Sequence, residues 1–179
     1  MPEAVAPPRY QLRPATAGDF AFLQTLHVAT LKEYVAQTWG WDDAAQAARF
    51  RAGFRPEASQ IVLVAGHEAG VLAVEQRPDA LFIANIAIVP EQQGRGLGAA
   101  LIDAVLAEAA RSGAATRLQV LRVNPARHLY ERLGFAIEGE TPTHYLLCAA
   151  PQGPDRPLSH ADAHRPDQQS PRANAEVRG

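Results

Sequence analysis

The chain has 179 residues, of which 47% are hydrophobic and 20% are charged, the balance of an ordinary globular protein. Seventeen Lys and Arg side chains stand against nineteen Asp and Glu, so nothing in the charge indicates a nucleic-acid or anionic-membrane partner. The lone Cys148 excludes an internal disulfide and a thiolate metal cluster. Because no segment reaches the roughly 20 apolar residues of a membrane span, and the N-terminus does not resemble a signal peptide, we expect a cytoplasmic protein.

Length and composition predict one domain between two tails. A chain of this length suits a single domain with a substantial core. We expect that domain over residues 10–150, after a flexible N-terminus at residues 1–9. Residues 151–179 hold five of the fourteen prolines and no aromatic side chain. Such a segment buries too little apolar surface to offset its ordering entropy, which predicts a disordered tail.

Strand and helix signals alternate along the expected domain. They come in the order β-α-α-β-β-β-α-β-α-β-β, which predicts an α/β fold built on a mixed sheet. The expected strands cover residues 10–13, 61–65, 71–74, 81–89, 118–123, 135–138 and 144–149. The expected helices cover residues from 16 or 19 to about 31, 42–53, 97–112 and 125–133.

Three of these elements carry more specific expectations. The second helix is expected to bury Ala45, Ala48 and Phe50. Residues 81–89 are nearly continuous apolar sequence broken only by Asn85, which predicts a central strand buried on both faces. The third helix has one apolar stripe and a glycine stop, formed by Leu97, Leu101, Val105, Ala109 and Gly113.

The strongest local signal is a glycine loop between the apolar strand and the third helix. Glycines at alternate positions permit positive φ and let a ligand approach the backbone. The free N–H groups at a helix N-terminus attract a pyrophosphate, and Arg95 can add a charge-assisted contact. The residues expected to hold the anion are Gln93, Gly94, Arg95, Gly96, Leu97, Gly98 and Ala99.

Two other glycine motifs do not fit this loop. A Rossmann fingerprint needs Gly-x-Gly-x-x-Gly near the first strand and an acidic residue about 20 positions later. The spacing Gly94, Gly96, Gly98 in mid-chain does not match it. A Walker loop needs Gly-Lys-Ser/Thr, and the loop has no lysine. A tight turn that only packs the strand against the helix remains an alternative.

The loop resembles the acyl-CoA signature Gln/Arg-x-x-Gly-x-Gly/Ala of the GNAT superfamily of N-acetyltransferases, at residues 93–98. Residues 86–90 are similar to the fourth strand of that family, and residues 123–135 resemble its second cofactor motif. The resemblance covers residues 10–149. It implies a mostly antiparallel sheet flanked by helices, with splayed fourth and fifth strands that admit acetyl-CoA. Residues 39–42 with 141–145 look similar to a poorly characterised bacterial branch of the family.

The resemblance also implies roles for single residues. Backbone groups of Ile88 and Val89 would bond the pantetheine arm of acetyl-CoA, and Asn124 would bond the pantetheine or its neighbour. Tyr130 falls where the family commonly donates a proton to the departing thiolate. A tyrosine with a pKa of about 10 stays protonated at neutral pH, as a general acid must. Simple packing of Tyr130 beneath the sheet is the alternative.

The acceptor side is less defined. An amine must lose a proton before it attacks, but Gln119 stands where some relatives carry a glutamate. The candidates for a base are Glu33, Glu75, Asp79 and His144. The family's substrate lid usually follows the first helix, where flat aromatic walls beside a carboxylate suit a cationic amine. The residues expected to bind the substrate are Glu33, Tyr34, Trp39, Trp41 and His144, with core packing as an alternative for Trp41.

These signals together predict transfer of acetyl from acetyl-CoA to a primary amine of a small molecule or peptide, by direct attack in a ternary complex. Use of a longer acyl group or of an amino-acid amine is an alternative within the same chemistry. A non-catalytic acyl-CoA sensor is the alternative from another class, motivated by Gln119. No metal, nucleic acid or membrane is expected as a partner, and a homodimer is possible in this family.

Overall fold

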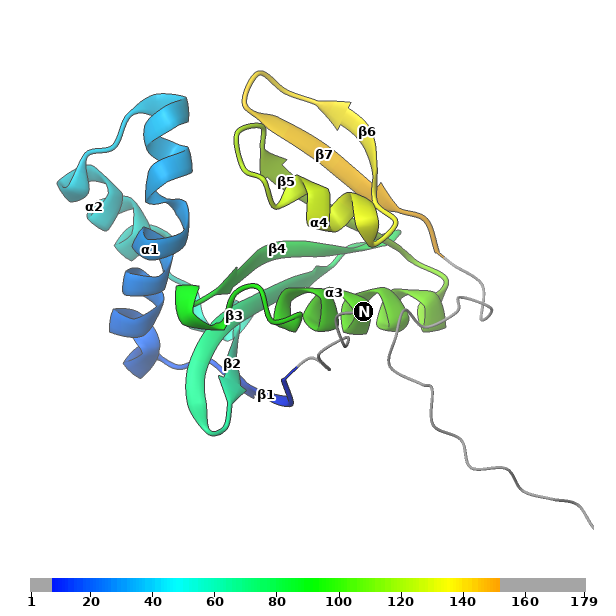
Figure 1. Cartoon of the computed structure of the whole chain (residues 1–179), viewed down its shortest axis with the longest axis horizontal. Helices are drawn as coiled ribbons and strands as arrows, with labels where there is room; N and C mark the ends of the chain where they lie inside the picture. Colours follow the sequence, from blue (N-terminus) through cyan, green and yellow to red (C-terminus); the bar gives the residue numbers. More distant parts are fainter. Residues whose placement is uncertain (1–7, 152–179) are drawn as a thin grey trace, which may run out of the picture.

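The computed structural model describes residues 8–151, so the predicted tails lie almost entirely outside the described residues. One mixed sheet runs through the domain in the order β1-β2-β3-β4-β5-β7-β6 (Figure 1). Only β4 and β5 are parallel; the other neighbours are antiparallel. The strands are β1 (Tyr10–Pro14), β2 (Gln60–Val64), β3 (His67–Gln76), β4 (Ala80–Ile88), β5 (Ala115–Leu121), β6 (Ala136–Glu140) and β7 (His144–Ala149).

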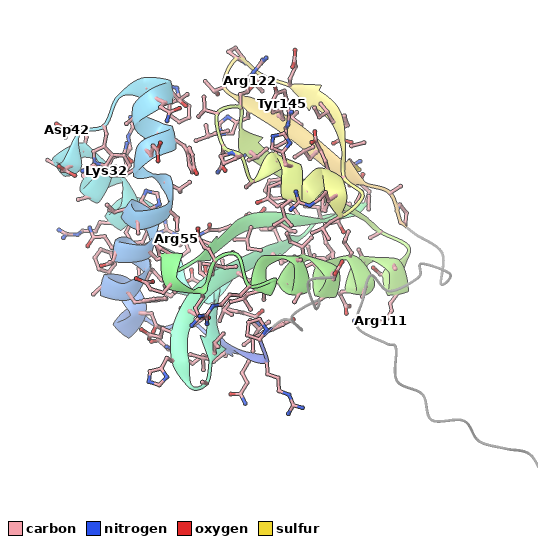
Figure 2. All side chains as sticks on the ribbon, in the orientation of Figure 1. Lys32, Asp42, Arg55, Arg111, Arg122 and Tyr145 are labelled. Atoms are coloured by element: carbon pink, nitrogen blue, oxygen red, sulfur yellow. The ribbon has the colours of Figure 1, made fainter. Side chains whose placement is uncertain are left out.

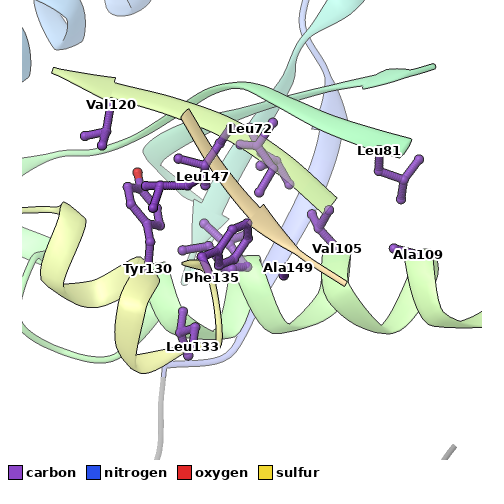
Figure 3. Close-up of a cluster of buried hydrophobic side chains, with 14 of the residues drawn as sticks. Leu72, Leu81, Val105, Ala109, Val120, Tyr130, Leu133, Phe135, Leu147 and Ala149 are labelled. Carbon is purple, nitrogen blue, oxygen red and sulfur yellow. The ribbon is translucent and has the colours of Figure 1, made fainter. Parts of the chain in front are cut away.

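Helices cover both faces of the sheet. One hydrophobic cluster joins the first two helices to β2 and β3, and the larger cluster joins the last two helices to the opposite face. Figure 3 shows part of the larger cluster, with Leu147 and Phe135 near its centre. No helix within residues 8–151 is both long and apolar enough to cross a bilayer. The helices are α1 (Phe20–Trp39), α2 (Asp43–Gly53), α3 (Leu97–Ser112) and α4 (Arg127–Arg132), with short 3₁₀ turns at Ala17–Asp19, Pro56–Ala58 and Pro90–Gln92.

Helix α3 has the bounds that its sequence pattern predicts. Its whole apolar stripe is buried, and Gly113 ends it at φ 66°, with its N–H directed at Ala109 and Ala110. A helix anchored along its length holds its N-terminus in a fixed place beside β4. This fixed N-terminus carries the glycine loop.

The first two helices differ from their predicted form. Helix α1 continues through Trp39 and ends where Gly40 turns the chain at φ 81°, so most of the segment expected as a lid is helical. The predicted burial of Ala45 and Ala48 is wrong, since both are exposed and Phe50 is half-buried. These alanines are exposed because α2 lies on the outer side of α1 and not beneath the sheet.

The connection between β2 and β3 is shorter than the gap between the strands predicted at residues 61–65 and 71–74. Only Ala65 and Gly66 form the turn, with φ of 50° and 81°, and β3 begins at His67. Two successive residues with positive φ give the turn type that matches the right-handed twist of paired strands. The longer β3 that results supplies one wall of the site.

Strand β4 is buried in its first half only. It pairs with β5 from Ala80 to Ile83, opposite Ala115 to Leu118, and no further. Beyond that point Ala84 and Asn85 are exposed, so the prediction of a strand buried on both faces is wrong for its second half. Figure 1 shows β5, β7 and β6 turned away from β2, β3 and β4. We call this parting of β4 and β5 the split.

A buried carboxylate anchors the start of α1 to β1. Asp19 is 6% exposed and accepts hydrogen bonds from the Arg13 guanidinium at 2.7 and 2.9 Å and from the Thr16 N–H at 2.7 Å. The hydrogen bonds from Arg13 hold the pKa of this carboxyl well below its usual range. The anchor fixes the helix that lines the pocket described below.

We expect Asp19→Asn to lower the free energy of unfolding at neutral pH by about 2 kcal/mol, because Arg13 loses a charged and largely buried partner. A lowered folded-state pKa contributes stability above the unfolded value of about 4, and this stability is lost as the pH falls through the folded value. Urea titrations at neutral pH and near pH 3 test this. The difference in the free energy of unfolding between variant and wild type should be smaller near pH 3 than at neutral pH. An equal difference at both pH values would argue against a charge effect.

Candidate active site

The split leaves backbone groups of β4 without a neighbouring strand. The Val89 N–H donates to the Ala69 carbonyl at 2.9 Å, towards β3. Because successive residues of a strand direct their backbone groups to opposite edges, the N–H groups of Ile86 and Ile88 face the edge towards β5. Strand β5 has left β4 by then, so these donors are open to a ligand.

Two of the predicted cofactor contacts are already used within the protein. The Val89 carbonyl accepts from the Gln92 N–H at 2.9 Å, and the Gln93 N–H donates to Pro90 at 3.2 Å. The Gln93 side chain donates to the Ile88 carbonyl at 2.8 Å. The Val89 backbone groups and the Gln93 N–H are thus bonded within the protein, and the Gln93 side chain closes the loop onto β4.

The glycine loop presents a run of backbone donors. Gly94 and Gly96 have φ of 72° and 81°, which only glycine adopts freely. Within residues 8–151, no N–H group from Gly94 to Ala99 has a hydrogen-bond partner; the first intrahelical bond of α3 is from Ala100 to Gly96 at 3.0 Å. Donors in this number at a helix N-terminus form an anion site. Arg95 is exposed beside them, with one long bond of 3.4 Å to Gln92.

Close packing brings the loop to α4. A Cβ atom added at Gly98 would lie at ordinary contact distances of 3.4 Å from Ile88 Cδ1 and 3.5 Å from Leu129 Cδ2, so α3, β4 and α4 meet at this position. Asn124 caps the approach to α4, because its Oδ1 accepts from the Ala126 N–H at 2.9 Å. Its amide NH₂ group has no partner among the described residues and remains able to donate.

Tyr130 lies at the level of the split. Its side chain rises from α4 towards the sheet, with its hydroxyl near Val120 (Figure 3). Val120 is two residues past the last β5 residue that pairs with β4. Tyr130 is 8% exposed, and burial raises its pKa to about 12. The hydroxyl is therefore protonated at neutral pH, the state in which it can donate a proton.

A pocket of about 400 Å³ lies on the opposite side of β4, between that strand, β3 and α1. We call it the α1–β4 pocket. Asn85 and Ala87 line it, while Ile86 and Ile88 pack with the core cluster on the α3 face. The side chains of the second half of β4 thus alternate between this pocket and the core cluster on the α3 face. The polar side chains that line the pocket are His27, Thr30, Arg55, Ser59, Glu75 and Asn85.

The five predicted substrate residues do not form one cluster. Trp39 and His144 meet, with ring centroids 5.9 Å apart, which links the end of α1 to the start of β7. Trp41 lies elsewhere: its Nε1 donates to Asp43 at 2.8 Å, and it lines a separate pocket of about 360 Å³ between α1 and α2. This position between α1 and α2 fits the core-packing alternative for Trp41.

The other two predicted substrate residues lie outside both pockets. Glu33 is exposed on α1 and accepts from Gln37 at 3.3 Å. Tyr34 is half-buried on the same helix, and its carbonyl accepts from the Thr38 hydroxyl at 2.8 Å. Neither side chain lines the α1–β4 pocket.

The candidate bases also lie in different parts of the structure. Asp79 is bound to Arg117 at 2.7 Å, at the end of β4 where the strands are still paired. His144 is hydrogen-bonded to the Thr143 hydroxyl at 2.9 Å, and its ring lies beside that of Trp39 at an interplanar angle of 44°. Glu75 is the one carboxylate among the residues that line the α1–β4 pocket.

Comparison with known proteins gives a family match over the middle of the chain. Residues 58–137 match the family model described as the acetyltransferase (GNAT) domain, a range that holds β4, the glycine loop, α3 and α4. Residues 58–137 thus carry a GNAT acetyltransferase domain.

Solved structures share the fold of this GNAT domain at low sequence identity. The PaiA N-acetyltransferase of Thermoplasma acidophilum, solved with coenzyme A, has a TM-score of 0.66 at 14% identity, over 79% of this chain and 99% of that one. Ard1 of Thermoplasma volcanium gives 0.58 at 20% identity, over 79% and 97%. A protein of Corynebacterium glutamicum described as histone acetyltransferase HPA2 and related acetyltransferase gives 0.61 at 20%, over 84% and 100%.

Sequence reasoning overlooked three residues that line the pocket of this GNAT domain. Arg55 follows α2, Asn85 interrupts an apolar strand, and His27 lies on α1 between the rings of Trp41 and Phe50, at 6.3 and 5.2 Å. Burial lowers the pKa of His27. The polar Asn85 in a central strand was the one signal available, since a buried strand rarely carries an unpaired amide.

No group of three or more His, Cys, Asp or Glu side chains within residues 8–151 is arranged to hold a metal ion. Cys148 is half-buried on β7, and burial raises the pKa of its thiol. A thiol with a raised pKa is a poor nucleophile at neutral pH, so we expect no covalent acetyl-enzyme at Cys148.

Proposed function

We propose that this GNAT domain transfers acetyl from acetyl-CoA to the primary amine of a small molecule or peptide, by direct attack in a ternary complex. One observation carries the proposal: the unpaired edge of β4 has an anion-binding loop at its end and a pocket on its other face. Two substrates can therefore meet at this edge, with acetyl-CoA on the α3 side and the amine in the α1–β4 pocket.

The proposed chemistry uses groups on both sides of the split. N–H groups from Gly94 to Ala99 bind the pyrophosphate, and the free N–H groups of Ile86 and Ile88 bond the pantetheine and polarise the thioester carbonyl. The amine nitrogen forms a bond to the carbonyl carbon, and the carbon–sulfur bond then breaks. The departing thiolate takes the proton of the Tyr130 hydroxyl.

Glu75 accepts the proton of the amine in this proposal, directly or through a water molecule. It lines the pocket from β3 and keeps half of its side chain exposed. It also accepts a hydrogen bond from the Arg77 guanidinium at 3.1 Å. This exposed ion pair contributes little stability and can dissociate. A carboxylate in this place both attracts an ammonium group and takes its proton.

We expect Glu75→Gln to lower kcat/KM by about 10²-fold, the lower range for loss of a general base. Glu33→Gln removes the same charge from α1 outside the pocket and provides the comparison. Steady-state rates for both variants, read by release of the coenzyme A thiol, test the assignment. A larger loss in Glu33→Gln than in Glu75→Gln would transfer the role to Glu33.

The function itself is tested with a panel of primary amines and acetyl-CoA, by thiol release and by mass measurement of the acetylated amine. Transfer to at least one amine is the expected result. Tight binding of acetyl-CoA without turnover on any amine would instead favour the sensor.

A further inference from the structure

The charges of the α1–β4 pocket indicate what kind of amine it accepts. Resting on the proposed function, we infer that the acceptor is a small zwitterion, an amine that also carries a carboxylate, such as an amino acid with an apolar side chain. The observations are one carboxylate, one guanidinium and one free amide in the same pocket, among apolar walls.

Arg55 is a cation held in place without an anionic partner. Its Nη1 donates to the carbonyls of Ala52 and Phe54, at 3.2 and 2.9 Å, which fixes the guanidinium at the end of α2. Figure 2 labels it between α1 and the sheet. Arg55 forms no ion pair within residues 8–151, whereas Arg77 forms one and Arg13 and Arg117 form two each. Its remaining N–H groups can bind a ligand carboxylate in the two-pronged manner typical of arginine.

Glu75 supplies the opposite charge on an adjoining segment. Gln60 pairs with Leu72, so Ser59 and Ala58 run alongside the second half of β3, the half that carries Glu75. Both charges thus belong to neighbouring parts of one pocket. A ligand with an ammonium and a carboxylate close together matches this pair, whereas a polyamine would leave Arg55 facing a like charge.

Asn85 connects the pocket to the reacting edge of β4. It is exposed on that strand, two residues past the last pair with β5, and its side-chain amide has no partner among the described residues. An amide both donates and accepts, so it can bond to either end of a zwitterion. It holds the amine near the open N–H groups of Ile86 and Ile88.

The rest of the pocket suits an apolar side chain. Leu26, Phe54, Val71 and Ala87 line it beside the charged groups. Its volume of about 400 Å³ is near the lower end for small-molecule sites, which fits one amino acid better than a long chain.

Binding can be measured apart from chemistry by titrating the full chain, saturated with free coenzyme A, in a calorimeter. The probes are L-leucine with isopentylamine and isocaproate, which lack its carboxylate and its amine in turn, then L-phenylalanine with phenethylamine and hydrocinnamate, and finally spermidine. We expect at least one amino acid to bind about tenfold or more tightly than both of its analogues and spermidine.

Arg55→Gln should reduce the affinity of that amino acid to that of its amine analogue, and leave the affinity of the amine unchanged. Arg49→Gln makes the same charge change on α2 outside the pocket. It should alter neither the affinity of the amino acid nor that of the amine. The inference is overturned if neither amino acid binds, if an amine or spermidine binds as tightly, or if Arg55→Gln weakens every probe alike.

These outcomes can be told apart from failure of the proposed function. If an amino acid binds but acetyl-CoA releases no thiol in its presence, the proposed acetyl transfer is contradicted and the inferred zwitterion pocket is supported. If thiol is released with carboxylate-free amines alone, transfer stands and the zwitterion pocket fails.

Discussion

Gly96→Glu is expected to weaken coenzyme A binding by about 100-fold or more, since the loop loses its shape and gains a negative charge beside the pyrophosphate. Gly96 has a φ of 81° and caps the N-terminus of α3. A side chain there strains the backbone, and the carboxylate would take the donors that bind the ligand. Calorimetric titration with coenzyme A measures the loss.

Gly113→Glu is the matched control, because Gly113 caps the other end of the same helix at φ 66° with open space around it. Both variants carry a similar backbone cost, of about 1–2 kcal/mol, and the same added charge. Only Gly96→Glu should lose the coenzyme. Equal losses in the two variants would attribute the effect to destabilised α3 and not to the anion site.

Tyr130→Phe is expected to lower kcat by about 10²–10³-fold, within the range for removal of a general acid, with the dissociation constant of coenzyme A changed little. The ring that packs against Phe135, at 6.0 Å between centroids, is retained. Because burial raises the pKa of Tyr130 to about 12, the acid stays protonated through neutral pH. Its deprotonation should therefore reduce the rate only in strongly alkaline solution.

Tyr10→Phe provides the comparison for this prediction. Tyr10 packs against the same core cluster from β1, and burial also raises its pKa, but it lies far from β5 in the sheet order. Its variant should keep full turnover. If Tyr130→Phe also keeps full turnover, Tyr130 is a packing residue and another group protonates the thiolate.

Patterns within short stretches of sequence predicted those elements whose structure depends on neighbouring residues. The stripe of α3 and its stop at Gly113 specify that helix completely, and strand β7 has its predicted bounds. The glycine loop was also recognisable, because glycines at alternate positions permit positive φ. These features hold the cofactor side of the proposed site.

The acceptor side depends on contacts between distant segments, which no local pattern reports. The α1–β4 pocket takes His27 from α1, Arg55 from the loop after α2, Glu75 from β3 and Asn85 from β4. Apart from Asn85, which interrupts an apolar strand, these residues show no pattern in the sequence that links them to one another. Strand β5 likewise leaves β4 after Leu118 but stays paired with the distant β7 through Leu121.

The two tryptophans show the same limit on a small scale. Trp39 and Trp41 are two residues apart, and both were expected to bind substrate. Helix α1 ends at Trp39 and Gly40 turns the chain, so one ring lies beside His144 and the other lies between α1 and α2. A change of direction at one glycine separates residues that the sequence places together.

Binding of coenzyme A to the backbone amides of the glycine loop is tested most directly by NMR, in a titration of the isotope-labelled full chain. The amide resonances of Gly94, Gly96, Gly98 and Ile88 should shift progressively and saturate together, while that of Gly113 stays in place. Unchanged loop resonances at saturating coenzyme, or shifts confined to other parts of the chain, would contradict the site.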